Sequence, residues 1–321
     1  MSSKPSPCLA IIIILLNATV SQALAGSEGS RARVITRRSK INLSTTTRPV
    51  KSVNRITILV DAFGKSAALK RDWGFSVFVE YGGKRILFDT GNNAEMFAQN
   101  VKALGVDLTR LDFVIISHRH GDHTAGLHHL LKVNRMVKIY APNDEHFGGP
   151  TPKHFFRGVS SLPSHMRYFD GMPPDNIPHG SAWKDANITR LQAITEISPG
   201  IRLISAVSQA PGTMELPELS LSIQTPKGQV IIAGCSHPGI EKILGAARAD
   251  KNPVYLIFGG LHLVTTPDAE IERVASALRD KWKVEGVAPG HCTGEPAFAA
   301  LQKIFGDKYL YAGLGTAVDL P

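Results

Sequence analysis

Four potential metal ligands lie within six residues of this 321-residue chain, in the segment Ser117-His118-Arg119-His120-Gly121-Asp122-His123. Alternate residues of an extended segment project to the same side, so His118 and His120 can share one metal ion. Asp122 and His123 are adjacent at the turn that follows, where they can point at a second ion. Imidazole and carboxylate groups are ordinary zinc ligands. The cluster therefore predicts a site for one or two metal ions.

The elements on either side of this cluster can position it. Residues 112–117 form an apolar run typical of a buried strand, and a helix is expected to follow through about residue 131. Ligands at the edge of a rigid sheet are held more precisely than ligands on a free loop. The alternative is a solvated histidine-rich loop, an interpretation that better suits His128 and His129, one helical turn later.

Further candidate ligands come later in the chain, again just after predicted strands. Cys235 and His237 follow a strand over residues 229–233 and a glycine, and His291 follows a strand over residues 286–288 and a turn. Neutral imidazole is a good zinc ligand. Either histidine could instead close a turn, and Cys235 could form a disulfide with Cys292 if the chain is exported.

The remaining pattern alternates short β-rich runs with segments of helical spacing. Strands are predicted over residues 55–62, 75–81, 84–89, 137–141, 201–207, 219–224 and 254–258, and helices over 94–104, 240–249, 268–281 and 297–305. Residues 142–186 lack clear periodicity, which predicts a cap over the metal edge or a surface insertion. Strands interspersed with helices favour an α/β sandwich, with sheets covered by helices.

Asp89-Thr90-Gly91 after a strand, followed by the H-x-H-x-D-H cluster, resembles the metallo-β-lactamase superfamily. Other segments are similar to the branch named for 7,8-dihydropterin-6-methyl-4-(β-D-ribofuranosyl)aminobenzene 5'-phosphate synthase, from about residue 55 to the C-terminus. These segments are Trp73-Gly74-Phe75, Leu87-Phe88-Asp89-Thr90-Gly91, Gly234-Cys235-Ser236-His237, Gly259-Gly260-Leu261-His262 and His291-Cys292-Thr293-Gly294. The resemblance implies a four-layered αββα sandwich with the metals at one edge of the two sheets.

The same resemblance implies how the ligands divide between two ions. His291 would complete the second position, with Asp122 and His123. In the superfamily, a further histidine completes the first position. Residues 205–219, where it would be expected, contain no histidine, so His237 is the candidate for this ligand. Cys235 stands where a bridging aspartate is expected, as a bridge or a near neighbour. This departure leaves open one or two ions, and zinc or a harder ion such as manganese or iron.

Two more residues near these motifs have alternative roles. Asp89 could orient a ligand imidazole through the ring N–H, or it could form a turn before Thr90-Gly91. His262 could contact the substrate, donate a proton or cap a loop.

The predicted function is a metal-dependent hydrolase of a small molecule, in which a metal-bound hydroxide oriented by Asp122 attacks an ester, lactone, amide or phosphodiester. His262 or a metal-bound water would protonate the leaving group. One alternative, implied by the branch name, is a synthase-type transferase acting on a dihydropterin. Export would disfavour it, because folate-like intermediates are expected inside the cell. A further alternative is a non-catalytic metal-binding or ligand-binding module.

The N-terminal segment has a different composition from the rest of the chain. Residues 1–25 have the basic start, short apolar run and small-residue cleavage site of a signal peptide, which predicts a periplasmic or secreted protein without a stable membrane anchor. The formal net charge of +9 is concentrated in a basic, Ser/Thr-rich leader over residues 26–54. The domain over residues 55–321 is nearly neutral, which disfavours nucleic-acid binding. No sequence feature favours one oligomeric state.

Overall fold

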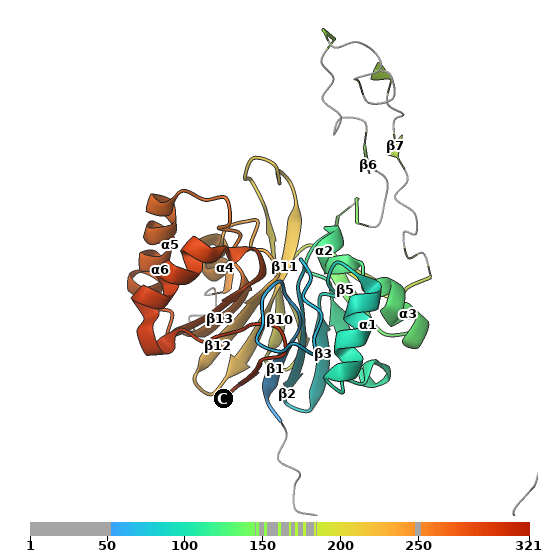
Figure 1. Ribbon diagram of the computed structural model, residues 1–321, viewed down its shortest axis with the longest axis horizontal. Helices are drawn as coiled ribbons and strands as arrows, with labels where there is room; N and C mark the ends of the chain where they lie inside the picture. The colour runs from blue at the N-terminus through green and yellow to red at the C-terminus, as the bar shows by residue number, and fades with distance from the viewer. Residues whose placement is uncertain are drawn as a thin grey trace, which may run out of the picture. The chain divides into compact units, whose positions relative to one another are not determined.

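Two β-sheets face each other across a shared layer of buried apolar side chains (Figure 1). Ile58, Val77 and Phe88 of the first sheet and Leu221 and Ile232 of the second belong to this layer, and all five are fully buried. These residues alternate with outward-facing positions along their strands, as expected when one face of each sheet packs on the other.

The computed structural model describes residues 53–144, 185–247 and 252–321, with a few positions between 145 and 184. The predicted signal peptide, almost all of the predicted leader and most of residues 142–186 lie outside the described residues. No helix in the part of the chain that is described is long and apolar enough to cross a membrane.

The first sheet has the strand order β15-β1-β2-β3-β4-β5-β8. The bounds are β1 (Arg55–Val60), β2 (Ser76–Tyr81), β3 (Lys84–Phe88), β4 (Phe113–Ile115), β5 (Ile139–Pro142), β8 (Ile188–Leu191) and β15 (Ala317–Asp319). Strands β3, β4, β5 and β8 are parallel to one another, and Phe88 pairs with Ile115. The carboxyl ends of β3 and β4, followed by Asp89 and Ser117, therefore lie at one edge.

The second sheet has the strand order β14-β13-β12-β11-β10-β9. The bounds are β9 (Thr195–Ser198), β10 (Ile201–Val207), β11 (Pro217–Thr225), β12 (Gly228–Ala233), β13 (Val254–Gly260) and β14 (Gly286–Gly290). Strands β12, β13 and β14 are parallel, and Ala233, Gly259 and Pro289 are in register. The residues that follow these strands therefore meet at one edge of the sheet.

Helices cover the outer face of each sheet. Helices α1 (Ala94–Ala103) and α3 (Leu127–Val133) share a buried apolar cluster with the first sheet, and α4 (Ile240–Ala247), α5 (Asp268–Asp280) and α6 (Glu295–Phe305) share another with the second. Figure 1 shows the two groups of helices on opposite sides of the sheets. The predicted four-layered αββα sandwich is confirmed.

Shorter elements complete the described chain. These are α2 (Gly121–Thr124), the 3₁₀ turns at Leu108–Arg110, His291–Thr293 and Gly306–Lys308, and the short pair β6 (Thr151–Pro152) and β7 (Asn176–Ile177).

The helix predicted after the ligand cluster is divided into α2 and α3. The chain between them passes close to Thr90, and a Cβ on Gly126 would clash with the Thr90 carbonyl oxygen. The backbone carbonyl of His123 in α2 also accepts hydrogen bonds from the amide and hydroxyl of Thr90, at 2.8 and 2.9 Å. The ligand-bearing turn is therefore fixed to the end of β3, at the cost of a continuous helix.

Candidate metal centre

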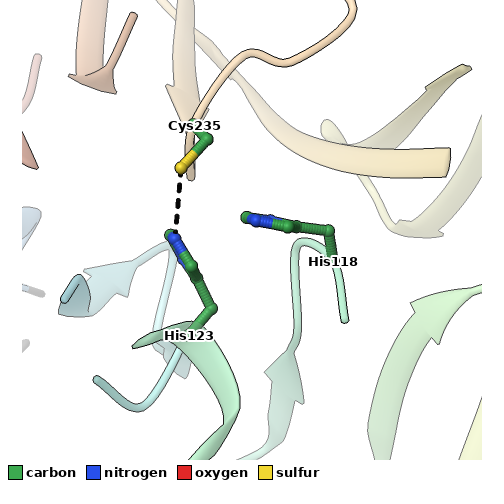
Figure 2. A group of neighbouring side chains, drawn as sticks. All are labelled: His118, His123 and Cys235. Atoms are coloured by element: carbon green, nitrogen blue, oxygen red, sulfur yellow. Dashed lines mark hydrogen bonds between the residues drawn. The ribbon is translucent and has the colours of Figure 1, made fainter. Parts of the chain in front are cut away.

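The structure brings all the predicted ligands together at the carboxyl ends of the parallel strands. One group consists of His118, His120 and His237, and another of Asp122, His123 and His291; within each group the candidate ligand atoms lie within 4.8 Å of one another. Cys235 lies within the same distance of both His118 and His123. Figure 2 shows these three side chains converging, with the thiol of Cys235 3.2 Å from His123 Nε2.

The first group presents three imidazoles to a common point. His118 Nε2 lies 3.1 Å from His120 Nδ1, and the ring of His237 lies 4.8 and 4.9 Å from the rings of His118 and His120. Neither ring nitrogen of His237 has a hydrogen-bond partner among the described residues, although the side chain is buried. A buried polar atom without a partner costs about 1–3 kcal/mol, and a cation at this point would remove that cost.

The second group combines one carboxylate with two imidazoles. Asp122 Oδ2 lies 3.4 Å from His291 Nε2 and 3.7 Å from His123 Nε2. Within the described chain, both ring nitrogens of buried His291 lack a hydrogen-bond partner. The donor sets of the two groups, three imidazoles and two imidazoles with a carboxylate, suit zinc or a similar divalent ion.

Asp89 fixes which nitrogen of each nearby ring is free. Its Oδ2 lies 2.7 Å from His123 Nδ1, so that nitrogen donates and Nε2 faces the metal position. The same carboxylate accepts the amide and hydroxyl of Ser117, both at 2.7 Å. Because the Ser117 hydroxyl donates to Asp89, its oxygen accepts from His118 Nδ1 at 2.8 Å. This hydrogen-bond geometry agrees with the orienting role predicted for Asp89.

Glu218 holds the turn that carries Cys235 and His237. Its carboxylate is almost fully buried and accepts the backbone N–H groups of Cys235, Ser236 and His237 at 3.1, 2.7 and 2.8 Å. Glu218 was not among the residues predicted from the sequence. The available signal was a lone acidic residue at the start of the otherwise uncharged strand β11.

Asp61 does the same for the turn that carries His291. Its fully buried Oδ2 accepts the backbone N–H of His291 at 3.0 Å, and its Oδ1 accepts that of Ala62 at 2.7 Å. This residue was also missed. Its signal was an acidic side chain directly after the apolar strand β1, the same position that Asp89 has after β3.

The cluster has the protonation pattern that cation binding needs. Burial lowers the pKa of His120 to about 4, that of His237 to about 2, and that of His118 well below the ordinary value. Burial alone would raise the pKa of Asp122, but the neighbouring imidazoles of His291 and His123 lower it below its ordinary value. At neutral pH the first group is therefore uncharged and Asp122 is ionised.

His123 and Cys235 differ in retaining a proton in the metal-free protein. Burial alone would lower the pKa of His123, but the adjacent Asp89 carboxylate raises the pKa to about 9. Burial raises the pKa of the Cys235 thiol. Metal ligation by either group must therefore release a proton.

Comparison with known proteins agrees with this geometry. Residues 73–291 match the family model of the metallo-beta-lactamase superfamily. The chain belongs to this superfamily. A relative from Methanocaldococcus jannaschii, 7,8-dihydropterin-6-methyl-4-(beta-D-ribofuranosyl)-aminobenzene-5'-phosphate synthase, is 30% identical over 293 residues, which cover 82% of this chain and 96% of the relative.

Solved structures have the same architecture. The crystal structure of Tm1679, a metal-dependent hydrolase of the beta-lactamase superfamily, has a TM-score of 0.64 and 27% identity, and the match covers 83% of this chain and 99% of that chain. YhfI from Bacillus subtilis, a metallo-beta-lactamase fold protein, has a TM-score of 0.53 at 13% identity and covers 84% of this chain and 100% of that chain. The second likeness shows the fold alone.

Within this member of the superfamily, both cysteines near the cluster are free. The thiol of Cys292 lies 3.7 Å from the carbonyl oxygen of Cys235 and donates to it. The disulfide considered from the sequence is not formed. His262 lies beside the cluster, with its ring 4.2 Å from that of His237. Burial alone would raise the pKa of Cys292, but its contacts with Cys235 and His262 lower it, and the Cys292 sulfur in turn raises the pKa of His262.

Four residues of the centre have left-handed backbone conformations without being glycine. Asp89, Ser236, His262 and His291 have φ angles of 57°, 63°, 50° and 48°. Such conformations cost about 1–3 kcal/mol each and persist where the surroundings enforce them, most often at functional sites. Their concentration on the turns of this cluster agrees with a functional role.

Proposed function

We propose that this protein is an exported, metal-dependent hydrolase of a small molecule, with zinc as its metal. The observation that carries the proposal is the pair of ligand groups, in which buried imidazole nitrogens have no partner among the described residues and the ligand turns are held from behind by Asp61, Asp89 and Glu218. A divalent ion in such a site lowers the pKa of a coordinated water and polarises the bond under attack.

Each side chain of the cluster has a proposed role. His118, His120 and His237 hold one ion, and Asp122, His123 and His291 hold a second. Cys235 lies between the two positions, where it serves as a shared ligand or a close neighbour.

Asp122 and His262 are the proposed catalytic residues. Asp122 also orients the attacking water through its carboxylate. His262 donates a proton to the leaving group from its place beside His237. Hydrolysis adds one water and breaks one ester, lactone, amide or phosphodiester bond.

A second candidate function comes from the relative in Methanocaldococcus jannaschii. Its name describes a synthase, and 30% identity over most of both chains favours a related chemistry here. The hydrolase is preferred because Tm1679, which is 27% identical, is a metal-dependent hydrolase. The predicted signal peptide also favours a substrate found outside the cytoplasm.

The test combines metal content with a substrate panel. Elemental analysis of the purified full chain is expected to give one to two ions, and His120→Ala and His291→Ala should each lower that content and abolish hydrolysis. His128→Ala is the matched control, because it removes an exposed imidazole from the same segment. Less than one ion per chain, unchanged by His120→Ala, contradicts the metal centre.

The panel itself separates the two enzymes. Esters, lactones, phosphodiesters, β-lactams and a dihydropterin supplied together with a ribofuranosyl-aminobenzene phosphate acceptor are incubated with the metal-loaded protein. Turnover of the dihydropterin without hydrolysis of any other compound identifies the synthase. Export is tested separately by N-terminal sequencing of protein recovered from the periplasm or medium, which is expected to begin near Gly26.

A further inference from the structure

Three loops around the metal centre each carry an exposed apolar side chain. Trp73 lies between β1 and β2, Met214 between β10 and β11, and Val264 between β13 and α5; they are 47%, 54% and 44% exposed. Exposed apolar residues scattered singly over a surface are normal. These three differ because each belongs to a loop that is bonded to a ligand-bearing turn.

The Trp73 loop is fixed to the second metal position. The indole ring lies 5.2 Å from the ring of His291. Two residues later, Phe75 donates its N–H to the Asp122 carbonyl at 3.1 Å. Between them, Gly74 has a φ of 147° and lies so near that carbonyl that a Cβ would be 2.7 Å from it. Trp73 is therefore held against the centre although half of it faces solvent.

The other two loops are bonded to the centre in the same way. The Ser208 hydroxyl donates to the His237 carbonyl at 2.9 Å, and Ser208 also bonds Thr213 and Glu215, which flank Met214. Val264 donates its own N–H to the Cys292 carbonyl at 3.2 Å. Figure 1 shows the β10–β11 hairpin extending beyond the sheets at the end of the molecule where α2 lies.

We propose that Trp73, Met214 and Val264 form an apolar rim that binds the non-reacting part of the substrate. The substrate class is then an ester or lactone with an alkyl chain of several carbons, which packs on the rim while its carbonyl lies at the metals. Binding of an alkyl chain would explain why loops so near a polar centre expose Trp73, Met214 and Val264. This inference rests on the proposed hydrolase function and narrows its substrate.

The first experiment measures chain-length dependence on the metal-loaded full chain. The substrates are γ-valerolactone, γ-octalactone and γ-undecalactone. Burial of each added methylene is worth up to about fourfold in kcat/KM, so the ratio between the long and short lactones is expected to be large. Trp73→Ala and Val264→Ser should each lower this ratio, while Met136→Ser, at a 73% exposed apolar residue after α3, should not. A ratio near one in an active enzyme overturns the proposal.

The second experiment does not depend on catalysis. The neutral fluorophore N-phenyl-1-naphthylamine is expected to bind the wild-type protein and to be displaced by γ-undecalactone more readily than by γ-valerolactone. The double variant Trp73→Ala/Val264→Ser should bind it at least fivefold more weakly, with circular dichroism and metal content unchanged. Weaker fluorophore binding by the double variant, in a protein that hydrolyses none of the substrates, supports the rim and contradicts the proposed hydrolase. Equal binding by the double variant and the wild type overturns the rim.

Discussion

Replacement of Asp89 by Asn tests whether the carboxylate behind the ligands selects their metal-binding tautomer. Asp89 accepts three hydrogen bonds of 2.7 Å, from the amide and hydroxyl of Ser117 and from His123 Nδ1. Asn has nearly the same shape, but one of its oxygens becomes an NH₂ group. If that group faces His123, the neutral imidazole that binds metal must carry its proton on Nε2 instead of Nδ1, which removes the lone pair that faces the metal.

The size of the effect follows from the same contacts. Loss of an orienting partner of this kind weakens metal binding by about 10- to 100-fold, which corresponds to about 1.4–2.8 kcal/mol. The effect should be largest at the position of Asp122, His123 and His291. A smaller effect is expected at His118, whose ring is oriented only through Ser117.

A chelator competition assay on the metal-free protein measures this change directly. Asp112→Asn is the matched control, because Asp112 accepts the amide of Arg85 and pairs with Lys84 at the opposite end of β4. If Asp89→Asn binds both ions within twofold of wild type while its fold is intact, the tautomer argument is wrong.

Three further predictions concern the groups behind the ligands and the protons that metal binding displaces. Glu218→Gln turns an amide NH₂ toward one of the three backbone N–H groups that Glu218 now accepts. Metal affinity at the His237 position, measured by chelator competition, should therefore fall by about 10- to 100-fold. Wild-type affinity in this variant would exclude a positioning role for Glu218. Calorimetric titration of the metal-free protein with metal at pH 7.5, in two buffers of different ionisation enthalpy, should show release of about one proton. That proton comes from His123, whose pKa is raised to about 9, and a second is released if Cys235 also binds the metal. No proton release would show that His123 is not a ligand. The difference in melting temperature between metal-loaded and chelator-treated protein should widen from pH 6.5 to 9. Burial raises the pKa of Asp61 and of Glu218 to about 7, and the Asp89 carboxylate raises that of His123 to about 9. Above about pH 7 the buried histidines with lowered pKa values are mostly neutral in both states, so the metal-free fold binds more protons than the unfolded chain and loses stability as pH rises. A constant difference would contradict this coupling.

Most of the regular elements could be predicted because each has its own local signal. The apolar runs that became β10, β12 and β13 are long enough to indicate buried strands, and Gly82-Gly83 indicates the hairpin between β2 and β3. The short strands β8, β9 and β15 were missed. Strand β15 has three residues and forms only by pairing with β1 from the other end of the chain, so nothing local specifies it.

The ligands could be predicted for a related reason. His118, His237 and His291 each follow a strand within a few residues, and parallel strands place such positions at one edge of a sheet. Asp61 and Glu218 were missed because their partners are backbone N–H groups 230 and 17–19 residues away. An acidic residue near a strand end is common, and only the tertiary fold distinguishes one that supports a ligand turn.

These carboxylates also explain how the centre can keep its geometry before a metal arrives. The ligand turns include strained backbone positions, and the imidazoles of His237 and His291 make no hydrogen bonds of their own within the described chain. Asp61 and Glu218 instead hold the backbone of these turns. Their negative charges are buried, so they destabilise the metal-free fold at high pH and favour the binding of a cation at the adjacent ligands. The same residues that preorganise the ligands therefore increase the affinity of the centre for metal.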